Sequence, residues 1–424
     1  MPPFMTEFPH PKSRLHRLFY RRGTRLLFIW LVCLAAVGLY VVCMSGWQSY
    51  SERWTRFDDL IVFRCVDVLI ASWFFFIGSS IGSFLNVVAW RMPRGVSVNG
   101  RSHCPRCNQT LSWKDNWPVF GWLALGGRCR TCRMSISPRY PIVELAVGLT
   151  ILFVGWREFY GCGSTLPFHD KGLGRVGALW TPYMTQENIV TMLYHAVAVA
   201  AAWAFALVRF DDHRLPRALV FSVLGLVIVP ILVSPGVAVV PWQVAMSPNW
   251  QADGRYLDAT MRVITGVAAA TLIGRALARY LSPMADPKID PLGKDTARLM
   301  DMIAMLIVPA VVVGWQAALG VTIVAVLIAY ALPVAVPSCP DALSRLGIGL
   351  VIALTLQLCC WRLLHNLGFF WPTIGSPPYV ILAWAAAILI VPRILLQPAN
   401  STSPVDFANP DSDDDQQSTD EPFV

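Results

Sequence analysis

Residues 299–335 read LMDMIAMLIVPAVVVGWQAALGVTIVAVLIAYALPVA, and Asp301 is the one charged residue in this stretch. The run is long enough for two membrane-spanning helices, since one span needs about 20 apolar residues. Similar runs recur at about 26–44, 66–90, 141–157, 188–208, 218–234, 259–281, 346–364 and 379–396. Backbone in lipid must satisfy its hydrogen bonds internally. The sequence therefore predicts an all-α polytopic membrane protein, a bundle of about ten transmembrane helices.

The overall composition agrees with this prediction. Hydrophobic residues make up 55% of the chain and charged residues 14%, whereas soluble globular proteins carry roughly 25% charged residues. A water-soluble fold of this size is therefore excluded. The net charge of +8 is first an orientation signal in a membrane protein, and nucleic acid is not an expected partner.

Lys and Arg concentrate in the first 25 residues and in the segment between the second and third spans. Because short basic loops face the cytoplasm, the N-terminus and this segment are predicted to be cytoplasmic. Successive spans cross the membrane in alternating directions. This alternation places the turn at 209–217 and the loop at 282–298 inside, and residues 158–187 and 235–258 outside. A basic cytoplasmic segment also suits anionic lipid headgroups as partners.

Four cysteines stand in this basic segment, with the pattern C-x2-C-x21-C-x2-C formed by Cys104, Cys107, Cys129 and Cys132. Each pair places two thiolates on one tight turn, and two such turns supply the ligands of a closed, structural Zn²⁺ site. Two disulfides or a redox pair would share this spacing, but a cytoplasmic location disfavours stable disulfides. His103 could replace one ligand, although a surface histidine is the simpler interpretation.

The segments around the cysteines read GSFLNVV at 82–88, RMPRG at 91–95, WKDNWPV at 113–119 and SPRYPIVEL at 137–145. Together with the cysteine pairs they resemble the type IV prepilin peptidases, membrane proteases of the GxGD aspartic class. The resemblance implies an endopeptidase of the bacterial inner membrane that cuts the basic leader from type IV prepilin-like or pseudopilin precursors at the cytoplasmic face. In some members the same protein then N-methylates the new N-terminus with S-adenosylmethionine.

With this resemblance the chain divides into four regions. Residues 1–65 hold the basic N-terminus, an extra transmembrane anchor and an external loop, and residues 66–157 form the prepilin-peptidase-like module with its zinc site. Residues 158–397 form a membrane-embedded helical domain. Residues 398–424 have too few apolar residues to pack and are predicted to be a disordered acidic tail.

The resemblance also implies two catalytic aspartates at helix ends, one ionised and one protonated. In the family the first ends a span and is followed, after about six residues, by a proline. Asp211 and Asp212 end the fourth span here, with the run to Pro216 shortened by about two residues. Adjacent aspartates in this place could equally form an interfacial charge cluster that caps a helix or sets topology.

Two residues compete for the second catalytic position, which follows Gly-x-Gly in the family. Asp295 has Gly293 two residues before it but Lys294 where the second glycine should stand. Asp301 lacks the glycines, yet it lies 13 residues before Gly314, close to the family's interval. Asp301 is favoured, because an ionisable residue at membrane depth is functional by default. The two would stand about 240° apart on one helix and cannot face one partner.

Two functions follow from these observations. One is an aspartic endopeptidase; the other is a catalytically inactive or diverged homologue that serves as a membrane docking protein for pilus or secretion assembly. A transporter is disfavoured, because the two halves show no corresponding broken helices. S-adenosylmethionine rests on the resemblance alone. Glu144 is expected in a structural ion pair with Arg139 or Arg91.

Overall fold

The computed structural model describes residues 22–52, 56–104, 106–161, 163–168, 186–242, 254–282, 285, 293–335 and 341–395. Within these ranges the regular elements are helices, accompanied by two isolated β-bridges. The predicted all-α fold is confirmed. The first 21 residues and the predicted acidic tail at 398–424 lie outside the described residues.

The helices follow one another in the order of the predicted spans. Their bounds are α2 Arg22–Ser51, α3 Phe57–Arg91, α4 Phe120–Leu125, α5 Arg139–Gly155, α6 Gln186–Phe210, α7 Arg217–Val233, α8 Gly254–Leu281, α9 Lys294–Val313, α10 Trp315–Ala335, α11 Ala342–Cys359, α12 Trp361–Asn366 and α13 Pro378–Leu395. Short turns of other helix types lie at η1 Met92–Arg94, η2 Trp156–Tyr160 and η3 Pro235–Val237.

A helix lies at each of the ten predicted span positions. Eight of those in the described residues are long and apolar enough to cross a membrane. The remaining two, α5 and α7, have 17 residues each, slightly under the length of a typical span. The four-cysteine segment lies between α3 and α5, as the sequence predicts.

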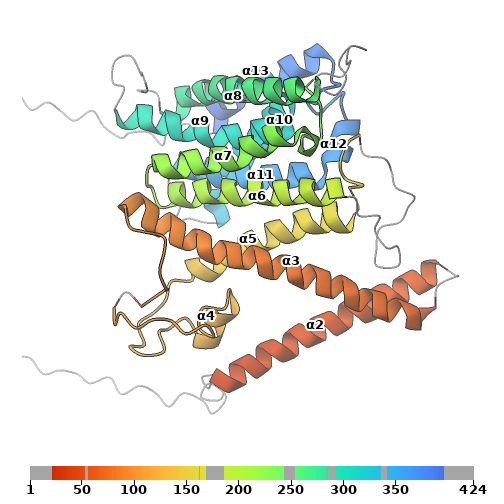
Figure 1. Ribbon diagram of the computed structural model, residues 1–424, viewed down its shortest axis with the longest axis vertical. Helices are drawn as coiled ribbons and strands as arrows, with labels where there is room; N and C mark the ends of the chain where they lie inside the picture. The colour runs from red at the N-terminus through yellow and green to blue at the C-terminus, as the bar shows by residue number, and fades with distance from the viewer. Residues whose placement is uncertain are drawn as a thin grey trace, which may run out of the picture.

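Figure 1 shows α6 to α11 and α13 stacked as a bundle, with α5 and α3 along one edge and α2 beyond α3. The centre of the bundle is formed by α9, α11 and α6, whose apolar side chains such as Leu306, Leu354 and Phe205 are buried. The outer faces of α2 and α13 expose large apolar residues. This pattern is typical of helices whose outer surface meets lipid.

Small residues bring α3 and α5 into close contact. Gly78 and Gly82 stand four residues apart on α3, the spacing of the small-xxx-small packing motif. A Cβ on Gly78 would lie 2.7 Å from Cβ of Ile151, and one on Gly82 would lie 2.9 Å from Cα of Glu144. The backbones of the two helices are therefore in close contact. Because the cysteine segment connects α3 to α5, this contact fixes the positions of its two ends.

Ion pairs join several helix ends on the side of the bundle that carries the cysteine segment. The N-terminal end of α5 contacts the residues after α6 through Arg139 and Asp211, and the C-terminal end of α6 contacts α9 through Arg209 and Asp301. Arg298 of α9 contacts Asp341 at the start of α11. The segments that the sequence predicts to be cytoplasmic thus meet at one end of the molecule.

Candidate metal centre and the aspartate cluster

The two cysteine pairs form two turns of the same design. Cys104 N–H donates to the carbonyl of Gln109 at 3.0 Å, and Cys129 N–H donates to that of Met134 at 2.8 Å. An isolated bridge closes each turn, His103 with Thr110 and Arg128 with Ser135. The residue directly after each pair has a positive φ, 54° at Asn108 and 59° at Arg133. The local sequence therefore builds two matching loops, each presenting two thiols.

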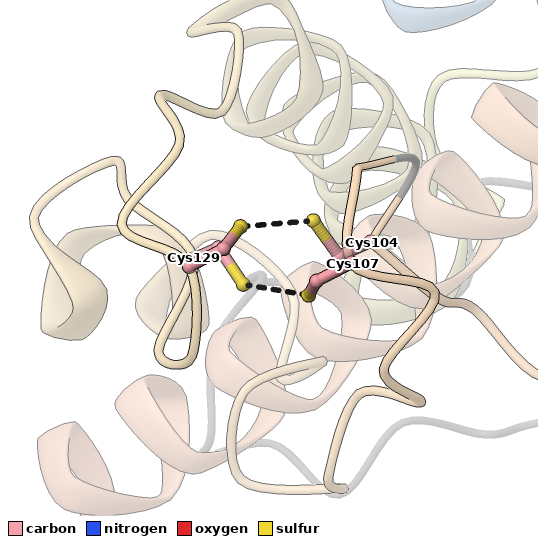
Figure 2. A group of neighbouring side chains, drawn as sticks. Cys104, Cys107 and Cys129 are labelled. Carbon is pink, nitrogen blue, oxygen red and sulfur yellow. Dashed lines mark hydrogen bonds between the residues drawn. The ribbon is translucent and has the colours of Figure 1, made fainter.

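The four sulfur atoms of Cys104, Cys107, Cys129 and Cys132 all lie within 4.8 Å of one another. The Sγ atoms of Cys104 and Cys132 are 3.7 Å apart, and those of Cys107 and Cys129 are 3.9 Å apart (Figure 2). A disulfide requires about 2 Å, whereas sulfurs bound tetrahedrally at 2.3 Å to Zn²⁺ are separated by roughly 3.8 Å. The geometry fits a metal ion held by four thiolates and does not fit two disulfides.

The turns favour the thiolate form of the first cysteine of each pair. Backbone N–H groups of Cys107 and Arg106 lower the pKa of the Cys104 thiol to about 6. Backbone N–H groups of Cys132 and Thr131 lower the pKa of Cys129 in the same way. At Cys132 the backbone N–H of Met134 lowers the pKa, but burial and the neighbouring thiols raise it to about 11. His103 lies outside the cluster, and its Nδ1 is 3.3 Å from the carbonyl of Arg101. The donor set is thus four cysteines.

Polar contacts hold the cysteine segment together and attach it to α5. Arg130 Nε, from the second cysteine turn, donates to Asp115 Oδ2 at 2.8 Å. Trp122 Nε1 on α4 donates to the carbonyl of Ile136 at 3.0 Å. The N–H of Val119 donates to Glu144 Oε2 at 2.7 Å.

The predicted ion pair of Glu144 is wrong. Its carboxylate accepts a backbone hydrogen bond from Val119. Arg139 instead pairs with Asp211 at 2.8 Å, and Arg91 Nη1 donates to backbone carbonyls at 97–99. The reason is local. Val119 has φ 59° and ψ −56°, so the chain turns at this residue with its N–H unused by regular structure, and a buried carboxylate satisfies it.

Arg209 is the centre of a buried cluster at the end of α6, with only 2% of its side chain exposed. Its Nη1 is 3.4 Å from Asp301 Oδ2, and its Nη2 is 3.3 Å from Asp341 Oδ2. Nη2 also lies 3.5 Å from Asp212 Oδ1. One guanidinium therefore contacts three carboxylates from three segments of the chain.

Asp301 is 6% exposed and lies at the level where α6 ends. Besides Arg209 it accepts the N–H of Leu215 at 3.3 Å. The charges of Arg214 and Arg298 also act on it. Asp295 is the second residue of α9, with its side chain partly exposed. The structure therefore brings Asp301, and not Asp295, to the end of α6, in line with the predicted separation of the two around the helix.

The two aspartates after α6 point to different partners. Asp211 forms its ion pair with Arg139 of α5. Asp212 has a side chain that is 73% exposed and a positive φ of 54°. The N-cap of α11, Asp341, was not a candidate; it accepts from Ser344 N–H at 3.2 Å and from Ser344 Oγ at 3.0 Å.

Comparison with known proteins identifies the domain that contains the cysteine cluster. The family model of the bacterial peptidase A24 N-terminal domain matches residues 76–158, which include the cysteine cluster and its supports on α3 and α5. The chain contains the N-terminal domain of the prepilin peptidase A24 family. The predicted resemblance is confirmed for this A24 N-terminal domain.

Individual relatives align over about a fifth of the chain. A prepilin leader peptidase/N-methyltransferase of Myxococcus xanthus is 50% identical over 92 residues, which is 22% of this chain and 27% of the relative. A type 4 prepilin-like proteins leader peptide-processing enzyme of Escherichia coli O78:H11 is 43% identical over 102 residues, 19% of this chain and 38% of the relative. The similarity thus spans well under half of either relative. No solved structure matches.

Arg209 is the residue that the sequence prediction missed. The six residues before Pro216 are 210–215, so the spacing of the resembled family puts Arg209 where the first catalytic aspartate would stand. That signal was present in the sequence. The prediction was restricted to acidic residues, and Asp211 and Asp212 fit it only with a shortened spacing to Pro216.

Proposed function

We propose that this protein binds the leader segments of type IV prepilin-like or pseudopilin precursors at the cytoplasmic face of the bacterial inner membrane, and that it does not cleave them. In this role it is a diverged homologue of the leader peptidases and a docking protein for pilus or secretion assembly. The A24 N-terminal domain supports the substrate class and the location. The contact between Arg209 and Asp301 supports the loss of cleavage.

The chemistry of Arg209 carries this proposal. Hydrolysis by two carboxylates needs one group that activates water and a second that gives a proton to the peptide carbonyl. An arginine stays protonated and has no acceptor, so it can serve neither as the second acid nor as the second base. Arg209 contacts Asp301 directly, and Asp341 and the carbonyl of His213 hold its guanidinium in place.

We also infer that the four cysteines bind Zn²⁺. With four thiolates the coordination shell is closed, so the metal would supply folding free energy to a segment with little core of its own, and no Lewis-acid step. Such a fixed domain would present Arg139 to Asp211 and keep the ends of α5 and α6 together.

A second function has its own support. Asp212 Oδ1 and Asp301 Oδ2 contact the same guanidinium, so a withdrawal of Arg209 would allow the acids after α6 to approach Asp301. In that case the protein is an aspartic endopeptidase in which Asp301 works with Asp211 or Asp212, and Arg209 controls their approach.

Binding of a precursor in proteoliposomes tests the first function. A prepilin-like precursor with a basic leader and a photoreactive group in that leader should crosslink to the protein, and its intact mass should show the leader still attached. A precursor that carries the same photoreactive group in a leader whose basic residues are replaced by glutamine is the matched control and should not crosslink. Absence of crosslinking to either precursor would contradict both functions. Loss of the leader in the bound fraction would select the endopeptidase.

A further inference from the structure

The A24 N-terminal domain carries a strongly one-sided charge. Residues 92–138 hold seven basic residues and one acid, Asp115, which is paired with Arg130. Four thiolates with one Zn²⁺ would add a net charge of −2, which leaves 7 − 1 − 2 = +4. The seven are Arg94, Arg101, Arg106, Lys114, Arg128, Arg130 and Arg133. Charge of this sign favours an anionic partner.

Aromatic side chains of the same domain reach the depth of the bilayer. The ring of Trp117 is 6.5 Å from that of Phe76 on α3 and 6.0 Å from that of Phe120. Phe76 lies 15 residues before Arg91, the last residue of α3, which is about 22 Å along the helix. In Figure 1, α4 lies between α3 and α2, beside the spans and not beyond their ends. Trp117 and α4 are therefore level with membrane-spanning segments.

These aromatic residues are open to the surroundings. Trp113 is 75% exposed and Trp117 is 51% exposed. Basic groups lie against two exposed indoles, Lys114 Nζ 5.3 Å from the centre of the Trp113 ring and Arg94 Cζ 4.9 Å from that of Trp90. Tryptophan next to Lys or Arg is typical of the level where hydrocarbon meets headgroups.

We propose that this aromatic–basic face, defined as Trp113, Lys114, Trp117 and Phe120, binds anionic phospholipid of the cytoplasmic leaflet. The indole and phenyl rings would lie among the acyl chains near the headgroups, and Lys114 would contact the phosphate. The lipid would hold the A24 N-terminal domain at a fixed depth between α2 and α3. This inference is independent of whether the protein cleaves a leader.

Native mass spectrometry of the full chain, released from vesicles with equal amounts of phosphatidylcholine and phosphatidylglycerol, tests the proposal. The wild type should retain phosphatidylglycerol over phosphatidylcholine by at least about threefold, since each basic residue near an anionic surface adds to attraction. The variant Trp113→Ser/Lys114→Gln should retain the two lipids equally, while its unchanged metal content shows that the domain still folds.

A matched control removes a cation and an aromatic ring elsewhere. Lys294 and Phe370 are both exposed and lie outside this face, so Lys294→Gln/Phe370→Ser should keep the wild-type preference. Equal retention of both lipids by the wild type, or an equal loss in the control variant, would overturn the proposal. Displacement of the lipid by an excess of glycerol phosphate would also overturn it, because the site would then recognise a free phosphate and not a lipid.

Discussion

At the scale of the residue, Arg209 decides what the acids at the end of α6 can do. Its guanidinium is buried and contacts Asp301, Asp212 and Asp341. These carboxylates stabilise the buried guanidinium, and Arg209 in turn stabilises the buried carboxylate of Asp301. Asp341 also pairs with Arg298, and Asp212 is exposed. Removal of one partner of a buried pair leaves an uncompensated charge, whereas removal of both can be nearly neutral.

A double-mutant cycle on this pair is the first prediction. Arg209→Met should lower the free energy of unfolding by about 3–5 kcal/mol, because Asp301 is left with one backbone N–H. Arg209→Met/Asp301→Leu should lose less than the sum of the single variants. Reversible unfolding in bicelles measures all four proteins. Strict additivity would show that the two residues do not interact.

Asp341 provides a prediction of pH dependence. Burial raises the pKa of this carboxyl. The hydrogen bond and charge of Arg298, together with Ser344 and Arg209, lower the pKa by more than burial raises it, so it lies below the ordinary value. A depressed pKa stabilises the folded state above the ordinary value of about 3.9, and this stabilisation is lost as the pH falls through the lower pKa of the folded state. Asp341→Asn keeps a good helix N-cap and removes the charge.

The stability difference between wild type and Asp341→Asn should therefore be constant from neutral pH down to about pH 5 and shrink at lower pH. Melting temperatures of both proteins across this range provide the measurement. A difference that grows on acidification would show that the interaction has the opposite sign.

At the scale of the element, the contact of α3 with α5 depends on two glycines. Gly82→Leu should force the helices apart, because its Cβ alone would lie 2.9 Å from Cα of Glu144, and overpacking of this kind costs about 1–3 kcal/mol. Gly38→Leu is the matched control, since a Cβ at Gly38 on α2 meets nothing within 4 Å. Thermal unfolding should show a loss for Gly82→Leu alone; equal melting temperatures would contradict the close packing.

The cysteine cluster predicts a defined metal content. The purified protein should contain about one Zn²⁺ per chain, and Cys104→Ser should lose most of it, because each of the four thiolates fills one position of a tetrahedral shell. Cys33→Ser, on the exposed side of α2, should keep the full content. Elemental analysis measures the metal. Full zinc content in Cys104→Ser would show that the cluster is not the site.

At the scale of the whole molecule, the sequence was sufficient for the helices and the cysteine cluster. Both depend on local signals: apolar length for the spans and short spacings for the two turns. The contacts of Glu144, Asp211 and Asp301 could not be read in this way. Each partner comes from another segment, and Arg209, Val119 and Arg139 become neighbours of these acids only after α3, α5, α6 and α9 pack.

The central proposal for the whole molecule is that the protein binds a prepilin-like leader and leaves it intact. The most direct measurement is the N-terminal mass of a precursor incubated with the purified wild type in proteoliposomes, beside Asp301→Asn and Asp295→Asn. We expect full-length precursor in all three samples and crosslinking of the leader to the wild type. Leader removal by the wild type and by Asp295→Asn, but not by Asp301→Asn, would contradict the proposal and establish an aspartic endopeptidase.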